Sequence, residues 1–303
     1  MKHQKLYLLF GLLLIPGLLL ASCAAPTPAP TAAPTQASTQ VPTQAATTML
    51  VSATPASQTE APFTLTVLAA ASLTESFTEI GTLFEAQHPG VTVGFNFAGS
   101  QALEAQLAQV VEADVFASAS PKYMTAAIET DKRVNADDSK TFVTNRLAVI
   151  FPRDNPAGIS VLKDLAQTGL KLDLADKAVP VGQYALDFLD KASADAAYGA
   201  DFKEKVLANV VSYEENVKAV VTKVSLGEAD AGIVYVTDIT ADAASKVGTL
   251  DIPDALNTIA SYPIAPIADS QHYETAKAFV DFVLSAEGQA VLAKYGFVPE
   301  AGK

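Results

Sequence analysis

The stretch Leu65–Glu75 reads L-T-V-L-A-A-A-S-L-T-E and indicates a strand that runs directly into a helix. Its first residues form a short apolar run of strand character, and three alanines then lead to Ser72. The sequence Ser-Leu-Thr-Glu has the pattern of a capping box, in which Ser72 at the helix start faces Glu75. After Ser72 the apolar residues recur at roughly helical spacing, at Leu73, Phe77, Ile80 and Phe84.

Ser72 can be interpreted in two ways. Serine is a preferred N-cap residue, so Ser72 can simply begin the helix. Alternatively, a turn of small residues before a helix N-terminus leaves backbone N–H groups and a hydroxyl directed outward, which is an arrangement that binds anions. The two interpretations are distinguished by whether other segments of the chain repeat the arrangement.

The same strand-then-helix unit recurs further along the chain. Val91–Phe97 alternates as a strand, and Ala98-Gly99-Ser100 leads from it into a helix with apolar residues on one side. Ser100 therefore occupies the position that Ser72 occupies in the first unit. A third strand, Ala113–Ala117, precedes a helix that Pro121 opens, which is a favoured position for proline.

Later segments continue the alternation. Strands are expected at 147–151, 170–174, 209–213, 231–236 and 247–252, and helices at 163–168, after 182, and at 215–226, 273–284 and 288–295. Pro263 and Pro266 interrupt 259–267, which predicts an edge strand or a crossover there. Strands that alternate with helices predict an α/β fold with mainly parallel sheets. Because the units are too many for one simple sheet, we expect two lobes, at about 63–145 with 259–303 and at about 146–258.

Residues 1–23 have the features of a secretory signal peptide. The start is positively charged, and the apolar core from Leu6 to Leu20 is too short and too interrupted for a membrane span. Cys23, the single cysteine of the chain, follows Leu20-Ala21-Ser22, which resembles the lipobox of bacterial lipoproteins. The resemblance implies cleavage before Cys23 and lipid attachment to it. The alternative is an ordinary signal peptide with an incidental cysteine.

Residues 24–61 consist mostly of Ala, Pro, Thr, Gln and Ser. This composition cannot bury a core, so it predicts a disordered linker. The remainder, 62–303, is the expected solute-binding domain and carries a formal net charge of −14, because only two of the 20 basic and one of the 33 acidic residues precede it. The acidic balance argues against nucleic acid as a partner. The negative net charge does not exclude a small anionic ligand, because neutral hydrogen-bond donors in a pocket act over short distances.

Five positions lie at strand ends or helix starts. They are Ser72, Ser100, Val181 in the turn Pro180-Val181-Gly182, Val217 at a helix start, and Tyr235 near the end of the 231–236 strand. In open parallel sheets, ligands bind outside the carboxyl ends of the strands, where all five positions fall. Taken alone, a buried tyrosine such as Tyr235 is more often a core residue, and Val181 and Val217 carry no sequence signal of ligand binding.

Four motifs in order make the chain recognisable. They are A-A-A-S-L at 69–73, F-A-G-S-Q-A-L at 97–103, A-D-V-F-A-S-A at 113–119 and G-I-V-Y-V-T-D at 232–238. As an ordered set they resemble the molybdate-binding proteins of bacterial ABC importers, and the closing K-Y-G-F at 294–297 fits as well. The resemblance covers essentially all of 63–299. It implies a two-lobed periplasmic-binding-protein fold of type II, with an oxyanion in the cleft between the lobes.

The resemblance also implies a role for each of the five positions. Ser72 and Ser100 would each offer a hydroxyl and a backbone N–H from the first lobe. Val181 and Val217 would offer backbone N–H groups from the second lobe, and Tyr235 its hydroxyl. The ligand would be molybdate or tungstate, held by hydrogen bonds without direct side-chain coordination of the metal.

Further expectations follow from the same resemblance. It implies no catalytic residue, no cofactor, and an ABC importer permease as the protein partner. We also expect a monomer that works outside the cytoplasm and is attached to the membrane by lipid on Cys23.

Two other functions remain open. Another tetrahedral oxyanion, sulfate or phosphate, would suit the same kind of site. A secreted serine hydrolase that uses Ser72 is less favoured, because no G-x-S-x-G motif surrounds this residue. His88 and His272 have no second ligand at metal-binding spacing. The adjacent Glu214 and Glu215 would not face each other at a helix start, so they do not form a catalytic pair.

Overall fold

The computed structural model describes residues 61–299. The predicted signal peptide, Cys23, the linker up to residue 60 and the last four residues lie outside this range, so the predictions made for them stay predictions. No helix in the described range is long and apolar enough to cross a membrane.

The first sheet has six strands, which come from two separate parts of the chain. They are β1 (Phe63–Ala70), β2 (Val91–Ala98), β3 (Val115–Ala117), β4 (Lys140–Asn145), β10 (Ala260–Pro266) and β11 (Val298–Pro299). Their order in the sheet is β11-β4-β10-β3-β1-β2. The helices of this lobe are α1 (Thr74–Gln87), α2 (Ser100–Ala108), α3 (Pro121–Glu129), α8 (Tyr273–Leu284) and α9 (Ala286–Lys294).

The strand β1 shows why this sheet is covered on both faces. Successive side chains of a strand point to opposite faces, so Val67 and Leu68 enter different layers. Val67 belongs to the same buried cluster as Phe84 of α1 and Phe279 of α8. Leu68 belongs to a second buried cluster that includes Leu103 of α2. The continuous apolar run Val67–Ala70 at the end of β1 therefore reflects burial from two sides.

The second sheet has five strands from the middle of the chain, in the order β7-β6-β8-β5-β9. They are β5 (Leu147–Pro152), β6 (Leu172–Ala175), β7 (Val210–Glu214), β8 (Ala231–Tyr235) and β9 (Val247–Asp251). The accompanying helices are α4 (Pro180–Ala194), α5 (Phe202–Ala208), α6 (Val217–Ser225) and α7 (Ala241–Lys246).

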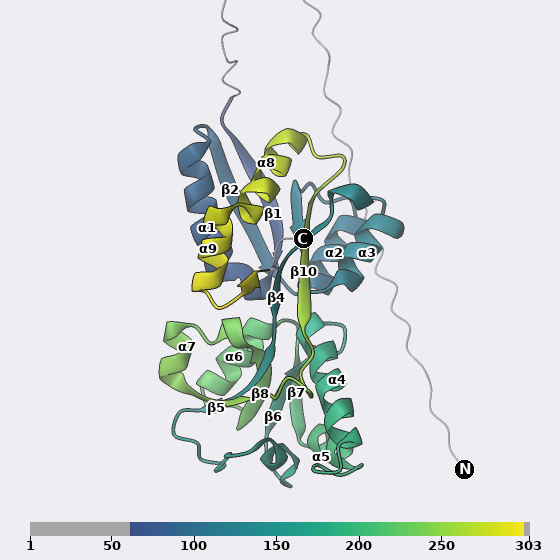
Figure 1. Cartoon of the computed structure of the whole chain (residues 1–303), viewed down its shortest axis with the longest axis vertical. Helices are drawn as coiled ribbons and strands as arrows, with labels where there is room; N and C mark the ends of the chain where they lie inside the picture. The colour runs from purple at the N-terminus through teal and green to yellow at the C-terminus, as the bar shows by residue number, and fades with distance from the viewer. Residues whose placement is uncertain (1–60, 300–303) are drawn as a thin grey trace, which may run out of the picture. The chain divides into compact units, whose positions relative to one another are not determined.

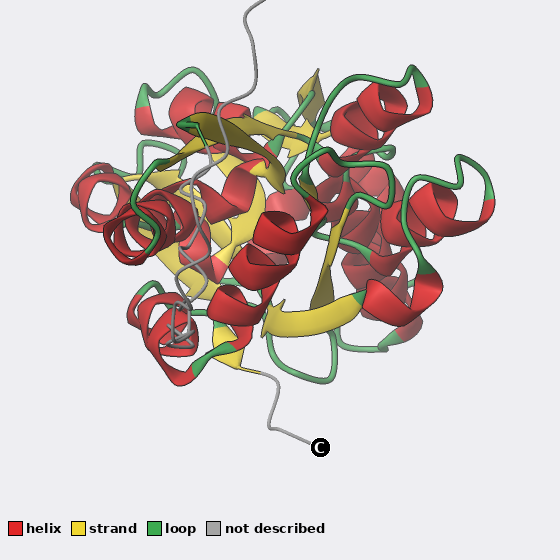
Figure 2. Ribbon diagram, turned by 90° about the horizontal axis from the view of Figure 1, so that it is seen from above, coloured by secondary structure: helices red, strands yellow, loops and turns green. Residues whose placement is uncertain are grey.

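The chain passes between the two sheets twice. Arg146 alone separates β4 from β5, and residues 252–259 join β9 to β10. We call the first sheet with its helices the first lobe and the second sheet with its helices the second lobe. In Figure 1 the first lobe lies above the second, and β4 and β10 extend toward the boundary between them. Figure 2 shows helices flanking the strands on several sides.

The α/β class is confirmed, and both sheets are mixed. Four of the six strands of the first sheet and four of the five strands of the second run in one direction. Strands β5 and β10 are the first strands after a passage between the lobes, so each starts at the boundary and runs away from it. Each is therefore antiparallel to both of its neighbours. The pairs β1–β2, β1–β3, β6–β7 and β6–β8 are parallel, as the alternation of strands and helices predicts.

Two local predictions differ from the structure. The segment with Pro263 is an interior strand rather than an edge, and a register shift between Tyr262 and Pro263 accommodates the proline against β4. The predicted capping box does not form, because a short 3-10 turn at Ala71–Leu73 precedes α1 and its N-cap residue is Leu73. The side chains of Ser72 and Glu75 are therefore available to other partners.

Candidate functional site

One small cavity lies between the lobes, and all five positions singled out in the sequence line it. Its volume is small, about 10 Å³. Each of the five residues is at most 3% exposed. The first lobe contributes Ser72 and Ser100, and the second lobe contributes Val181, Val217 and Tyr235.

Several helices begin at this cavity. The 3-10 turn that holds Ser72 leads into α1, while α2 starts at Ser100, α4 at Pro180 and α6 at Val217. The first N–H groups of a helix have no partner within the helix, and the N-terminus carries partial positive charge. The cavity therefore receives backbone donors from both lobes, in the arrangement that binds anions at helix N-termini.

Local sequence explains why these N–H groups stay available. Pro180 occupies the first turn of α4 and has no N–H of its own, which makes Val181 the first backbone donor of that helix. At α6, the side-chain oxygen of Asn216 accepts a hydrogen bond from the N–H of Ala219 at 3.1 Å. The cap therefore uses the third N–H of the helix and leaves that of Val217 to the cavity.

Three hydroxyl groups complete the lining. The Oγ of Ser100 accepts a hydrogen bond from the N–H of Ala119 at 2.9 Å, and the Oγ of Ser72 lies 2.9 Å from the hydroxyl of Tyr262. The hydroxyl of Tyr235 is buried and has no hydrogen-bond partner in the described range. Burial raises the pKa of Tyr235 well above 10, so this group keeps its proton and is a donor. A buried donor without a partner is costly, which favours a bound acceptor at this position.

The cavity contains no charged side chain. Its other lining residues are Ala70, Ala71, Ala98, Gly99, Ala119, Val179, Pro180 and Asn216. No group of three or more His, Cys, Asp or Glu residues within 61–299 could hold a metal ion. Chemically, the arrangement offers neutral hydrogen-bond donors and lacks any carboxylate that would repel an anion.

The two histidines of the folded part contribute to local packing. His88 stacks on the ring of Phe84 at a centroid distance of 3.8 Å, and His272 stacks on Phe63 at the same distance. Neither histidine lines the cavity. The Glu214 carboxylate pairs with Lys223 rather than with Glu215.

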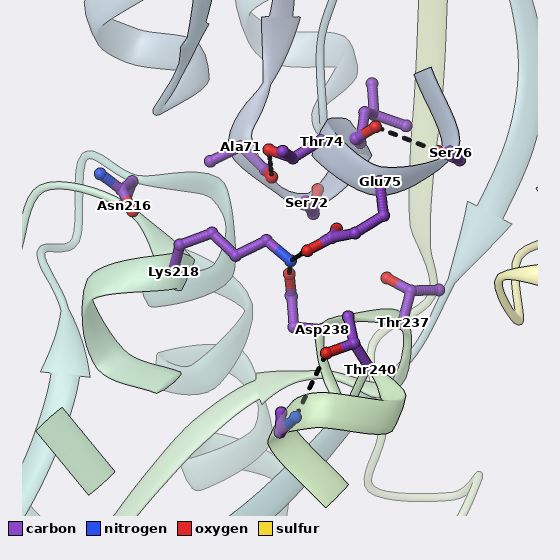
Figure 3. A network of polar contacts seen from close by, with 12 residues as sticks. Ala71, Ser72, Thr74, Glu75, Ser76, Asn216, Lys218, Thr237, Asp238 and Thr240 are labelled. Atoms are coloured by element: carbon purple, nitrogen blue, oxygen red, sulfur yellow. Dashed lines mark hydrogen bonds and ion pairs between the residues drawn. The ribbon is translucent and has the colours of Figure 1, made fainter. Parts of the chain in front are cut away.

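Contacts between the lobes surround the cavity. The side-chain amide of Gln101 donates to the backbone oxygen of Glu215 at 2.8 Å, and the hydroxyl of Tyr123 donates to the backbone oxygen of Ala178. The amine of Lys218, on α6, lies 2.8 Å from Glu75 of α1 (Figure 3). The two lobes therefore meet around the site.

The ion pair at Lys218 also includes Asp238, whose carboxylate lies 3.2 Å away. Burial raises the pKa of Asp238 to about 6, although Lys218 opposes the shift. For Lys218 itself, burial alone would lower the pKa, but the carboxylates of Asp238 and Glu75 outweigh it and raise the pKa above 10.5. The site is thus accompanied by a charged cluster that lies outside its lining.

No local sequence signal marks Lys218, Asp238, Asn145 or Tyr262 as residues near the site. Tyr262 lies in the proline-containing segment interpreted as an edge strand, and its contact with Ser72 joins residues 190 positions apart. The polar residue Asn216 before α6 was a recognisable capping signal.

Comparison with known proteins agrees with this description. Residues 65–298 match the family model of the bacterial extracellular solute-binding proteins. The molybdate-binding protein ModA of Mycobacterium tuberculosis is 35% identical over 246 residues, which cover 81% of this chain and 88% of ModA. A putative ABC transporter substrate-binding lipoprotein of Bacillus subtilis, YvgL, is 30% identical over 245 residues, covering 80% and 90% of the two chains. These relatives are named for binding rather than for catalysis.

A solved structure supports the fold independently. The periplasmic molybdate-binding protein of Azotobacter vinelandii superposes with a TM-score of 0.67 at 17% identity, over 78% of this chain and all of the other. The architecture is therefore the two-lobed periplasmic-binding-protein fold of type II. The chain belongs to the bacterial extracellular solute-binding proteins and is a relative of the molybdate-binding proteins.

Proposed function

We propose that this chain is the solute-binding component of a molybdate ABC importer, and that it holds the oxyanion by hydrogen bonds in the cavity between the lobes. The observation that carries the proposal is the convergence of Ser72, Ser100, Val181, Val217 and Tyr235 on one uncharged cavity. The relationship to molybdate-binding proteins supports the choice of ligand.

The chemistry of the cavity suits molybdate. Near neutral pH molybdate is a fully deprotonated dianion and accepts hydrogen bonds at every oxygen. Ser72 and Ser100 would each supply a hydroxyl and a backbone N–H, Val181 and Val217 a backbone N–H, and Tyr235 its hydroxyl. Hydrogen bonds to a charged group contribute about 1.5–3 kcal/mol each. The surrounding neutral groups would bind the dianion without a counter-charge.

Because the donors come from both lobes, the ligand would tie the lobes together. The oxyanion would first meet one lobe and then bridge both as the two chain crossings act as a hinge. The permease of the importer would recognise the closed form. No cofactor takes part in this cycle.

The same proposal includes a lipid anchor. Cys23 follows a lipobox-like sequence, and the relative YvgL is named a lipoprotein. Lipid on Cys23, followed by the linker at 24–61, would hold the binding domain at the outer side of the cell membrane as a monomer.

The other candidate ligands are less suited to this cavity. Phosphate keeps at least one proton near neutral pH, and burying that O–H without an acceptor costs about 1–3 kcal/mol, or roughly 5- to 150-fold in affinity. Sulfate has no such proton but is smaller than molybdate, so it would fit the donors less well. Tungstate has nearly the charge and size of molybdate and would bind comparably.

A hydrolase is the weakest alternative. A serine nucleophile needs an adjacent base that accepts its proton. The group next to Ser72 is the hydroxyl of Tyr262, and no histidine or carboxylate lines the cavity.

Isothermal titration with molybdate, tungstate, sulfate and phosphate in turn tests the function. We expect molybdate and tungstate to bind most tightly, sulfate less tightly and phosphate least. Tighter binding of phosphate than of molybdate, or turnover of an ester substrate, would refute the proposal.

A further inference from the structure

A chain of buried polar groups lies behind Ser72. The hydroxyl of Tyr262 lies 2.9 Å from the Oγ of Ser72, and the Nδ2 of Asn145 lies 3.3 Å from the same hydroxyl. Tyr262 has no exposed surface, Asn145 is 2% exposed and Ser72 is 3% exposed. Water does not compete for these groups, so each must satisfy its hydrogen bonds within the protein.

The orientation of the Asn145 amide is fixed by its other contacts. Its Oδ1 accepts a hydrogen bond from the backbone N–H of Arg146 at 2.9 Å. The Nδ2 therefore faces Tyr262 on one side and the Oγ1 of Thr237 on the other, at 2.8 Å from the latter. An amide nitrogen can only donate, because it has no acceptor capacity.

The direction of the remaining hydrogen bonds follows from this constraint. The Tyr262 oxygen accepts from Asn145, and the acceptor that lies within hydrogen-bond distance of the Tyr262 hydroxyl in the described range is the Oγ of Ser72. The buried Tyr262 proton is therefore satisfied when it is given to Ser72. Ser72 then accepts from Tyr262, and its own proton points elsewhere. Its Oγ has no other hydrogen-bond partner among residues 61–299, and Ser72 lines the cavity.

We propose that Asn145 and Tyr262 are positioning residues that fix the proton of Ser72, so that Ser72 acts as a hydrogen-bond donor toward an oxyanion in the cavity. This inference rests on the proposed function and accounts for a preference for fully deprotonated anions. Tyr262 occupies one of the two lone pairs of Ser72 and turns the Ser72 proton toward the cavity, so a protonated anion meets a donor there.

The second serine is held in the same way by a different group. The Oγ of Ser100 accepts from the backbone N–H of Ala119, which can never reverse its role. Ser100 is thus also left with a free proton to donate. Ser72 lacks a backbone donor on its Oγ, and the Asn145–Tyr262 pair takes that place.

We call the hydrogen bonds that run from Asn145 through Tyr262 to Ser72 the relay. All three residues belong to the first lobe. Asn145 ends β4, Tyr262 lies in β10 and Ser72 follows β1, which are all strands of the first sheet. The donor character of Ser72 is therefore set before the lobes close on a ligand. The second hydrogen of the Asn145 amide goes to Thr237 of the second lobe, so Asn145 also joins the two lobes.

The variant Tyr262→Phe tests the relay, because it keeps the ring and removes only the hydroxyl. We expect molybdate to bind roughly 2- to 10-fold more weakly, as expected for one lost hydrogen bond. Phosphate should bind unchanged or more tightly, because Ser72 becomes free to accept. The matched control is Tyr273→Phe, which removes a hydroxyl bonded to Asp138 away from the cavity, and it should change neither affinity.

A double-mutant cycle separates positioning from general damage. In the Ser72→Ala background, Tyr262→Phe should change molybdate affinity by less than twofold, because it acts through Ser72. Equal weakening of both anions, or an undiminished effect in the Ser72→Ala background, would overturn the proposal.

The direction of the hydrogen bond between Tyr262 and Ser72 can also be measured in the parent protein without any ligand. An NMR experiment should show the Tyr262 hydroxyl proton close to the β-protons of Ser72. A Ser72 hydroxyl proton directed at the Tyr262 oxygen would overturn the relay. If the parent binds none of the four oxyanions, the proposed function fails. The NMR measurement still decides which of the two hydroxyls donates the hydrogen bond.

Discussion

The amine of Lys218 lies 3.2 Å from the carboxylate of Asp238, a side chain with no exposed surface, and 2.8 Å from Glu75 in the other lobe. Neither oxygen of Asp238 has a hydrogen-bond partner in the described range, so the ion pair is what offsets the burial of this carboxylate. The pair lies beside the candidate site and connects it to the packing between the lobes (Figure 3).

Removing the Lys218 amine leaves the buried Asp238 carboxylate without a counter-charge, so the variant should be less stable than the parent. Lys218→Met should lower the free energy of unfolding by about 3–5 kcal/mol at pH 8. The loss should be smaller at pH 5, because the pKa of Asp238 is about 6 even with Lys218 present, and an unpaired carboxylate would hold its proton to higher pH. Urea unfolding at the two pH values measures this difference.

The double variant Lys218→Met/Asp238→Asn serves as the control. It removes the buried charge together with its partner, so it should recover most of the stability lost at pH 8. A double variant that is no more stable than Lys218→Met would show that the amine contributes through packing alone.

The second prediction concerns the two serines. Ser72→Ala and Ser100→Ala should each weaken molybdate by roughly one to two decades, as expected for a lost hydrogen bond to a charged group. Val181→Ala should do far less, since only its backbone N–H would be used. Titration of the three variants compares them directly. Parent-like binding by both serine variants would mean that molybdate does not occupy this cavity.

The parts of the fold that could be predicted are encoded locally. The segment at Leu65–Glu75 holds most of a strand, a turn of small residues and the start of a helix within eleven positions, and the segment around Ser100 repeats the pattern. Val181 and Val217 fall at the carboxyl ends of such strands, but their role as site residues came only from the resemblance to the molybdate-binding proteins, because neither residue has a chemical signal of its own.

The parts that could not be predicted depend on the two chain crossings. The direction of β10 follows from its entry from the second lobe, and its prolines gave a misleading signal because a register shift absorbs Pro263. Tyr262 then reaches Ser72 across 190 positions of sequence, and Lys218 reaches Glu75 across 143. Short sequence patterns do not predict contacts between residues that lie so far apart in the chain.

The third prediction follows from the two-lobed origin of the donors. A ligand that binds only the folded state stabilises it by about 2.7 kcal/mol at a hundredfold excess over its dissociation constant. Molybdate should therefore raise the melting temperature by several degrees, and small-angle scattering should show a more compact particle. The absence of both changes at saturating molybdate would rule out closure of the lobes on the ligand.

The fourth prediction concerns the anchor. Cys23→Ala should release the protein from membranes or block its processing, because no other residue of the chain is a cysteine. Membrane fractionation and the mass of the mature chain report the two outcomes. A variant that is processed and fractionated like the parent would show that Cys23 carries no lipid.

The last prediction concerns a second buried carboxylate, Asp173 in β6, remote from the cavity lining. Asp173 has no exposed surface, and neither carboxylate oxygen has a partner in the described range. Burial and the neighbouring Glu214 carboxylate raise its pKa from 3.8 to about 7, although Lys223 opposes the shift. Between about pH 4 and pH 7, the folded state therefore keeps a proton that the unfolded state has released.

This difference in bound protons makes stability fall as pH rises through that window, and the cost stays in full above it. Asp173→Asn keeps the shape of the side chain and removes the charge. It should therefore raise the melting temperature at pH 8 and leave it nearly unchanged at pH 4. The exposed Asp251, changed to Asn, is the matched control and should show no such difference. Equal effects of Asp173→Asn at both pH values would mean that the carboxylate does not hold its proton in the folded state.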